Sequence, residues 1–210
     1  MTPQSVTPAD WADLTARHPD LRHLPAPVAG KAKLMTLAAE AVLFRRGEPP
    51  RVIHYLVEGE IHMVRHSRNG SVAILLRAQR GFFAEASLDA SAYHCDAVAK
   101  MACFVLAFPL PAFQAALDGS KAFRRTTFAR QAREIRRLRS QCERLSLPTA
   151  QGRLIHYIDI EGQDGVIELT QTVKALAAEL GLTHETLYRT LAQMEKTGAL
   201  KRAGNRIELL

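Results

Sequence analysis

The chain has 210 residues, 47% of them apolar, which is enough for one large domain or two small ones. It carries 28 lysines and arginines against 21 acidic residues, and the net charge of +7 makes an acidic partner such as nucleic acid worth testing. The opening residues lack the apolar core of a secretory signal, and the longest near-apolar run, residues 101–117, is too short and too interrupted by proline to cross a membrane. We therefore expect a cytoplasmic protein without a membrane partner.

A β domain is predicted first. From about Leu34 to Phe108, short runs of Val, Ile, Leu and Phe are separated by glycines every 11 or 12 residues. This spacing is typical of antiparallel strands that close into a sandwich or small barrel. The segments 57–60 and 67–71 contain residues that tolerate positive φ, and they predict two hairpin turns. We place this domain at residues 1–118.

A long helix is predicted next. Residues 120–145 contain neither glycine nor proline, and their apolar side chains recur with the heptad spacing of a coiled coil. An amphipathic helix that packs on its own β domain has the same pattern. Because arginines border the apolar face, we favour pairing with a second copy of the chain, and we place this dimerisation helix at residues 119–147. The predicted interface consists of Phe128, Ile135 and Cys142 at a positions and Leu138 and Leu145 at d positions, with Gln131 as a polar interruption.

The last predicted domain spans residues 148–210. Pro148 ends the long helix, because proline disfavours helical geometry in the residue before it, and Thr149 is the expected N-cap of the next helix. That helix covers about 151–160, and a short strand follows at 166–169 after a glycine-containing turn.

Residues 170–196 have the pattern of a helix, a tight turn and a second helix. Thr170 is expected to cap the first helix and Thr183 the second, and Gly181 supplies the left-handed residue of the turn. Ala177, four residues before this glycine, is small enough to let the two helices cross closely. This spacing is the signature of a helix-turn-helix, whose second helix enters the major groove of DNA.

Four polar side chains on the second helix are candidates for reading bases. With the apolar residues facing inward, His184, Glu185, Tyr188 and Arg189 face outward from its first turns. An arginine can bond guanine O6 and N7 together, and a glutamate can accept from cytosine N4. The alternative is an ordinary surface ion pair between Glu185 and Arg189, four residues apart. The position of the pair at the start of this helix favours base reading.

A hairpin is predicted after the second helix. Its turn is Gly204-Asn205, and Lys201, Arg202 and Arg206 place cations where a phosphate backbone would run beside such a wing. The partner is double-stranded DNA. The predicted contacts are Thr170, Thr172, Thr183, His184, Glu185, Tyr188, Arg189, Lys201, Arg202 and Arg206.

At this point the chain resembles the CRP/FNR family of bacterial transcription regulators. The resemblance lies in LFRRGEPPRVIHYLVEGEIHMV and GFFAEASL in the β domain, in the long helix, and in LAAELGLTHETLYRTLAQMEKTGAL near the C-terminus. It implies an α+β fold with a jelly-roll-like antiparallel β-roll, a dimerisation helix and a winged helix-turn-helix. It also implies a homodimer that is not an enzyme and that binds a pseudo-palindromic site, with RNA polymerase as a candidate partner. Glu185 and Arg189 match the family's Glu and Arg that read a TGA-type half-site, whereas His184 stands where some members have another Arg.

The resemblance also bears on the effector. In members that bind cyclic AMP, a Gly-Glu segment and a downstream Arg-Ser or Arg-Thr pair hold the cyclic phosphate, because that group needs a fixed cation. Here the downstream pair reads Tyr93-His94, and the positions that would meet adenine fall on Leu138 and Arg139. We therefore do not expect cyclic AMP in its usual pose, and the small-molecule or redox effector stays unknown. The pocket residues implied are Glu85, Ser87, Tyr93, His94, Cys95, Leu138 and Arg139.

Cysteine and histidine content limits the cofactors. The three cysteines fit neither a disulfide framework nor a zinc signature, and the iron–sulfur members of the family use four. His94-Cys95 leaves haem, metal or thiol oxidation as an alternative sensor chemistry, although a strand histidine beside a small buried thiol explains the pair more simply. A cupin-type metalloenzyme would need a His-x-His motif, which the sequence lacks, and a dimerising adaptor is a further rival. We assign no catalytic or metal-binding residue.

The positive charge does not lie where DNA binding is predicted. Residues 1–118 have a net charge of +1, residues 119–148 of +7 and residues 149–210 of −1. The DNA-binding prediction therefore depends on the placement of a few cations and on the helix-turn-helix spacing. If phosphate contacts are few, we expect a modest salt dependence of binding.

Overall fold

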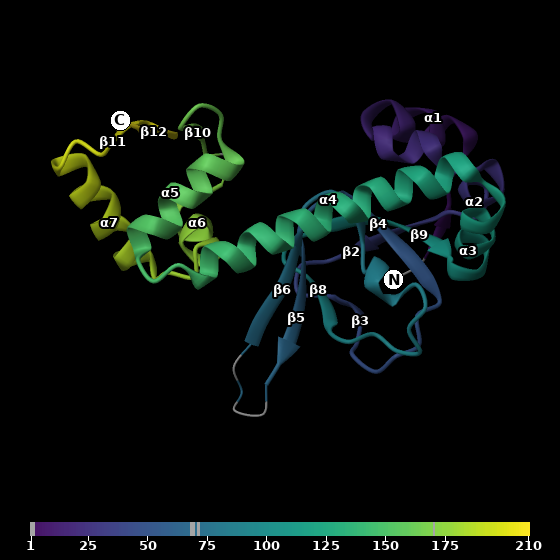
Figure 1. Cartoon of the computed structure of the whole chain (residues 1–210). Coiled ribbons are helices and arrows are strands. Elements are labelled where there is room, and N and C mark those ends of the chain that lie inside the picture. The colour runs from purple at the N-terminus through teal and green to yellow at the C-terminus, as the bar shows by residue number, and fades with distance from the viewer. Residues whose placement is uncertain (1–2, 68–69, 71, 170) are drawn as a thin grey trace. The chain divides into compact units, whose positions relative to one another are not determined.

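The chain forms two compact units, Met1–Phe128 and Ala129–Leu210 (Figure 1). The computed structural model describes residues 3–67, 70, 72–169 and 171–210. The predicted α+β class is confirmed, because antiparallel sheets come first, a long helix follows, and a mainly helical unit with a small sheet comes last. Among the described helices, none combines the length and the apolar character needed to span a bilayer.

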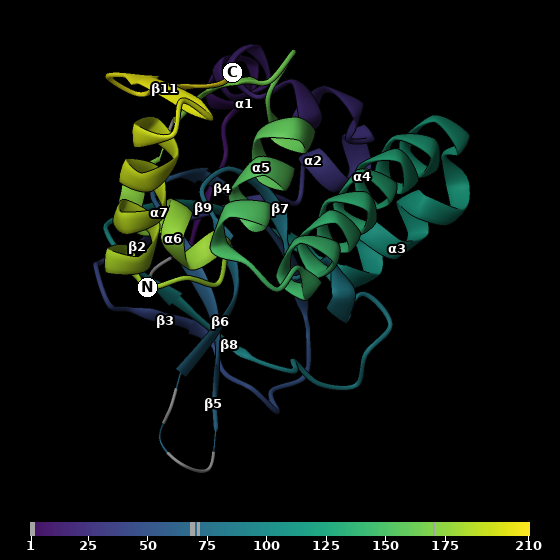
Figure 2. The same cartoon turned by 60° about the vertical axis from the view of Figure 1, so that its left-hand side comes forward.

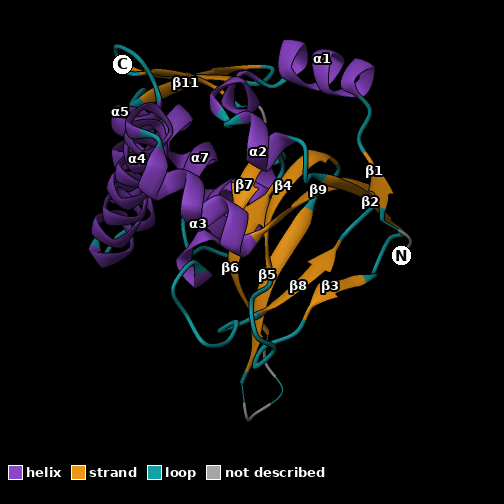
Figure 3. Ribbon diagram, turned by 90° about the vertical axis from the view of Figure 1, so that its right-hand side faces the viewer, coloured by secondary structure: helices purple, strands orange, loops and turns teal. Residues whose placement is uncertain are grey.

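The first unit contains two antiparallel sheets. One has the strand order β1-β2-β9-β4-β7 and the other β3-β8-β5-β6 (Figure 3). Successive side chains of a strand face opposite sides, so in β4 Ile53 and Tyr55 join one apolar core while Leu56 joins the other. The strands are β1 (Gln4–Ser5), β2 (Lys33–Leu37), β3 (Val42–Phe44), β4 (Val52–Glu58), β5 (Ile61–His66), β6 (Val72–Ala78), β7 (Gly81–Phe83), β8 (Asp96–Ala99) and β9 (Cys103–Pro109).

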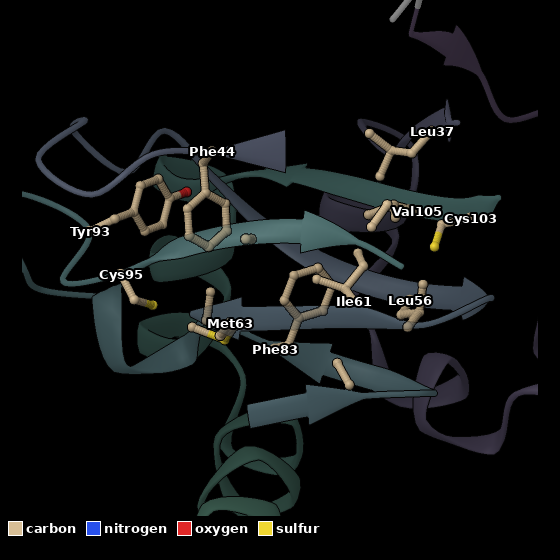
Figure 4. Close-up of a cluster of buried hydrophobic side chains, with 14 residues drawn as sticks. Leu37, Phe44, Leu56, Ile61, Met63, Phe83, Tyr93, Cys95, Cys103 and Val105 are labelled. Atoms are coloured by element: carbon tan, nitrogen blue, oxygen red, sulfur yellow. The ribbon is translucent and has the colours of Figure 1, made fainter. Parts of the chain in front are cut away.

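The core of the sandwich contains a row of stacked rings. Phe44 and Tyr93 lie face to face with ring centroids 3.7 Å apart (Figure 4). His54 stacks between Phe44 and Phe83, with ring centroids 5.5 Å from each. Aliphatic and sulfur-containing side chains fill the rest of this core, as Figure 4 shows for Met63 and its neighbours. The first unit is therefore packed by aromatic contacts along its middle.

Helices cover the other face of the five-stranded sheet, and the sequence pattern did not predict them. They are α1 (Pro8–Arg17), a 3-10 turn (Pro19–His23), α2 (Ala26–Ala29) and α3 (Leu110–Gly119) (Figure 3). A capping box starts α1, since the Asp10 N–H donates to Thr7 Oγ1 and the Asp10 carboxylate accepts from the Thr7 N–H. Trp11 packs edge-on against Phe108 of β9, which holds the N-terminal segment on the sheet.

One of the two predicted hairpins is wrong. The turn at 57–60 connects β4 of the five-stranded sheet to β5 of the other sheet, so it carries the chain between layers. Gly59 has φ +105°, and a Cβ there would lie 2.5 Å from Cys103 Sγ and 2.6 Å from the Ala102 carbonyl oxygen. Close approach of β9 therefore requires this glycine. The strands on either side of the second turn, β5 and β6, pair as predicted, although residues 68, 69 and 71 lie outside the described residues.

The long helix α4 (Lys121–Ser146) agrees with the predicted one to within a residue or two. It runs from the first unit into the second, with Phe128 and Ala129 at the division. Loop residues 147–149 separate it from α5, and the Gly152 N–H donates to Thr149 Oγ1, which confirms the predicted N-cap.

The second unit packs three helices on a small sheet. Strands β11 and β12 form the predicted hairpin, and β10 pairs with β12 to give the order β10-β12-β11. Leu176, Leu187, Leu191, Met194 and Ile207 are buried at the centre, so the apolar spacing of the sequence identified the core of this unit. The elements are α5 (Ala150–Glu161), β10 (Val166–Glu168), α6 (Val173–Glu179), α7 (His184–Lys196), β11 (Leu200–Ala203) and β12 (Arg206–Leu209).

Candidate nucleic-acid interface

The α6–α7 turn has the predicted geometry. Gly181 has φ +63°, the Leu182 N–H donates to the Ala177 carbonyl at 2.8 Å, and Ala177 is buried where the helices meet (Figure 2). Thr183 caps α7 as expected, since its Oγ1 accepts from the Thr186 N–H at 3.1 Å. Thr170 lies outside the described residues, and the N-cap of α6 is Thr172.

The four candidate base-reading residues share one exposed face of α7. His184, Glu185, Tyr188 and Arg189 are all exposed, and the rings of His184 and Tyr188 meet edge to face at 4.5 Å. In the described part of the chain, Glu185 and Arg189 form no ion pair with each other. The carboxylate and the guanidinium are therefore available to an external partner.

A shallow recess adjoins Arg189. It has a volume of about 360 Å³ and is lined by Gln151 from the first turn of α5 and by Arg189, Thr190, Gln193 and Met194 from α7. Sequence reasoning missed Gln151 and Gln193. Their amide groups can donate and accept hydrogen bonds, and the only sequence signal was the position of Gln151 directly after the Thr149-capped helix start.

The three cationic side chains of the β11–β12 hairpin, Lys201, Arg202 and Arg206, differ in the contacts that they make within the chain. The Arg202 guanidinium pairs with Glu195 of α7, which lowers the pKa of that carboxyl and raises the pKa of the arginine through their hydrogen bond. Arg206 lies 3.3 Å from Glu208 on the same strand. Lys201 is exposed and stands opposite Glu208 in the hairpin register. Arg202 is thus the wing residue most committed to a contact inside the chain.

The predicted dimer seam is exposed in the single chain. Phe128 is 62% exposed and Ile135 50%, and Leu138, Cys142 and Leu145 are exposed as well. Large apolar side chains at this exposure along one helix face are typical of an interface that a partner covers.

The predicted effector residues of the first unit differ in burial. Tyr93 is buried, donates a hydrogen bond to the Val52 carbonyl at 3.4 Å, and has its pKa raised to about 12 by burial and by the Glu48 carboxylate. His94 is exposed, whereas the neighbouring Cys95 is fully buried, and burial raises the pKa of its thiol. Both residues lie in the bend before β8, and only the His94 side chain is open to an external ligand.

The segment that contains Glu85 and Ser87 forms a short 3-10 turn, Glu85–Ser87. It follows Ala84, whose φ of +64° places a non-glycine residue in the left-handed region. Ser87 is buried, and its Oγ has no hydrogen-bond partner in the described chain. Leu138 and Arg139 belong to the second unit, so their predicted share in the pocket stays a prediction.

One recess of the first unit includes a predicted residue. It has a volume of about 340 Å³ and contains Tyr93 but none of the other predicted pocket residues. Among the described residues, no group of three or more His, Cys, Asp or Glu side chains could hold a metal ion. The lining residues are Leu43, Phe44, Glu48, Pro49, Arg51, Val52, His54 and Tyr93.

Two family models match the chain. Residues 34–120 match the cyclic nucleotide-binding domain, and residues 152–210 match the Crp-like helix-turn-helix domain. No curated protein sequence matches at a significant level.

Solved structures share the fold at low sequence identity. The chain is 23% identical to DNR from Pseudomonas aeruginosa, with a TM-score of 0.53 over 95% of this chain and 93% of that one. For FixK2 from Bradyrhizobium japonicum the identity is 21% and the TM-score 0.59, over 85% and 92% of the two chains. A CooA mutant from Carboxydothermus hydrogenoformans gives 17% and 0.64, over 85% and 84%.

Proposed function

Because this chain belongs to the CRP/FNR family of DNA-binding transcription regulators, we propose that it acts in the cytoplasm as a homodimer on a pseudo-palindromic site with TGA-type half-sites. The exposed and unpaired Glu185 and Arg189 on the first turns of α7 are the observation that carries the proposal. As a regulator rather than an enzyme, it would have DNA and RNA polymerase as its partners.

Direct base reading by these two side chains follows from their chemistry. Arg189 presents a planar fork of donors that matches guanine O6 and N7, and Glu185 one turn earlier can accept from a cytosine N4 amino group. Thr183 and Thr172 stand at helix N-termini, where hydroxyl and backbone N–H groups suit phosphate oxygens. Phosphate contacts would thus set the register, and the α7 pair would supply the specificity.

Pairing through α4 follows from the exposed seam, and charge favours a parallel arrangement. In the heptad register, Glu134 occupies a g position and Arg139 the following e position. A parallel pair of helices places Glu134 of each chain near Arg139 of the other. Parallel helices also place both α7 helices at the same end, as a palindromic site requires.

The sensor is proposed to act without cyclic AMP in its usual pose. Tyr93 stands where a cation would hold the phosphate, and its ring is stacked on Phe44 inside the core. The full burial of Cys95 beside the exposed His94 gives no support to a haem, metal or redox site at that pair. We therefore propose another small molecule as the effector. Thermal-shift screening of the intact protein would identify it by a rise in the melting temperature.

Replacing Arg189 by alanine tests base reading. We expect the variant to lose about 1–3 kcal/mol of binding free energy on the cognate site and to relax the preference at a single base pair, because one bidentate contact disappears. Fluorescence anisotropy with a set of single-base-pair operator variants measures both effects. Lys196→Ala, at the far end of the same helix, is the matched control. An equal loss on every DNA sequence would mean that Arg189 contacts only phosphate.

A further inference from the structure

Arg144 is the one arginine of α4 that is fully buried among the described residues, with 1% of its surface exposed. It lies in the last turn of the helix, two residues beyond the seam position Cys142. A guanidinium does not lose its proton in a protein, so its burial must be compensated by nearby acids or rings. The other arginines of this helix have no comparable need.

Three elements meet at this guanidinium. Arg144 Nη2 lies 3.3 Å from Glu161 Oε1 at the end of α5, and Nη1 lies 3.7 Å from Glu179 Oε1 at the end of α6. The guanidinium carbon stands 4.7 Å from the centre of the Tyr157 ring. Gln171 completes the cluster, donating to Glu179 Oε2 at 2.8 Å and to the Tyr157 hydroxyl at 3.1 Å.

The cluster adjoins the turn that aims the recognition helix. Glu179 precedes Leu180 and Gly181, and both of those carbonyl oxygens accept from Arg153 Nη1 at 3.2 Å. Arg153 Nε also donates to the Leu147 carbonyl at 2.9 Å, and a Cβ added at Gly181 would lie 2.6 Å from Leu145 Cδ2. Arg153 and Leu145 therefore connect the end of α4 to the turn between α6 and α7.

Stability alone is a poor explanation for this arginine. Replacing a buried ion cluster by uncharged side chains of similar size is often neutral or stabilising, because desolvation offsets the attraction. In addition, Arg144 Nε is buried without a hydrogen-bond partner in the described chain, which adds a cost. The charge does supply a contact that depends on orientation, because the two carboxylates lie on different helices and a shift of α4 would take the guanidinium away from one or both of them.

We propose that Arg144 is a positioning residue, which fixes the end of α4 to α5 and α6 and so sets the placement of α7 relative to the dimer helix. The proposal rests on the proposed function, because the placement of α7 matters for DNA only if α4 forms the dimer axis. Under it, the α4–α5 junction is a rigid joint, and the distance between the two reading helices of a dimer is set by the buried cluster.

The main test variant removes the charges together. Arg144→Met, Glu161→Gln and Glu179→Gln are combined, so that no carboxylate is left facing another, and the melting temperature is expected to stay near that of the wild type. Spin labels on two introduced cysteines, Arg133→Cys at an exposed f position of α4 and His184→Cys on α7, report the α4–α7 distance in a Cys142→Ser background, and Cys95 and Cys103 are buried away from the reagent. Mixing labelled with excess unlabelled protein isolates the distance within one chain. We expect a narrow distance distribution for the parent protein and a broad one for the triple variant. Arg136→Met, an exposed arginine on the same helix, is the control.

A DNA measurement supplies the second readout. On the two-half-site operator we expect the triple variant to bind about 2- to 30-fold more weakly. It should also lose its preference between the natural half-site spacing and a spacing changed by one base pair, an effect that a merely stabilising residue would not have. Arg144→Lys, which keeps the charge but cannot reach both carboxylates as a fork, is expected to fall between the two.

An unchanged distance distribution in the triple variant would overturn the proposal. If that variant does not fold, the same result in Arg144→Lys would overturn it. The distance measurement needs no DNA, so a wild-type protein that binds no specific site would refute the proposed function while leaving the role of Arg144 to be decided by the labels.

Discussion

Ile135→Asp is expected to convert the protein from a dimer to a monomer and to abolish specific operator binding at concentrations where the wild type is bound. Ile135 is half exposed in the single chain, so the substitution leaves the protomer fold intact. In a paired seam, however, it would bury two unpaired carboxylates against each other at a central a position. Sedimentation equilibrium measures the association state, and circular dichroism checks that the helix content is retained.

Ala129→Asp is the matched control, because it introduces the same side chain on the same helix at an exposed b position outside the seam. That variant should stay dimeric. Cys142 gives an independent check, since it is exposed at an a position and a parallel pair places the two thiols opposite each other. Mild oxidation should then yield a disulfide-linked dimer. A dimer that survives Ile135→Asp and shows no Cys142 cross-link would place the interface elsewhere.

Lowering the pH from 7 to 5 is expected to reduce the free energy of unfolding of the first unit by about 2 kcal/mol through His54. Burial lowers the pKa of His54 to about 4, well below the value near 6.5 of an unfolded histidine. Between these two pH values the unfolded chain binds a proton at His54 that the folded chain excludes. The free energy of unfolding therefore keeps the contribution of neutral His54 above about pH 6.5 and decreases as the pH falls towards about 4. His18 adds to the loss in the same direction, because burial and the nearby Arg80 lower its pKa.

Urea denaturation at pH 7 and pH 5 measures this loss. His54→Phe should keep the stacking between Phe44 and Phe83, remove the unpartnered Nδ1 and flatten the pH dependence, which makes it more stable than the wild type at pH 5. The exposed His94→Gln is the control and should follow the wild-type profile. If His54→Phe loses as much stability on acidification as the wild type, the proton is taken up elsewhere.

The second unit was the more predictable part of the fold. Its elements are short-range, and each is marked by residues with one physical role, such as Thr183 as a cap, Gly181 at positive φ and Ala177 at the helix crossing. Local steric and hydrogen-bonding rules are sufficient for such features. The exposed face of α7 followed directly once its buried face was assigned.

Layer assignment in the first unit was not predictable in the same way. A glycine between two strand-like runs indicates a change of direction, but it does not say whether the second strand pairs with the first. At Gly59 the answer depends on Cys103, more than forty positions later in the chain, whose backbone lies against the turn. The helix α3 was missed because Pro109 and Pro111 read as interruptions, whereas proline is well tolerated at a helix start.

The candidate site shows the same difference between features set by local sequence and features set by packing between elements. Exposure of Glu185 and Arg189 follows from helical periodicity, but the pairing of Arg202 with Glu195 and the burial of Arg144 depend on how separate elements pack. Sequence counts the charge of each arginine equally. The structure shows that some of these charges, such as those of Arg144 and Arg202, already pair with acids inside the chain.

The strand order of the first unit also determines when its five-stranded sheet can form during translation. Strand β2 lies between β1 and β9 and pairs with β9, Lys33 standing opposite Ala107, so the five-stranded sheet cannot close until β9 has left the ribosome. Until then the edges of β2 and β4 that pair with β9 lack their partner strand. A chaperone would be needed during this period. Helices α3 and α4 follow β9 in the chain, so the sheets of the first unit can close before the predicted dimer seam has been made.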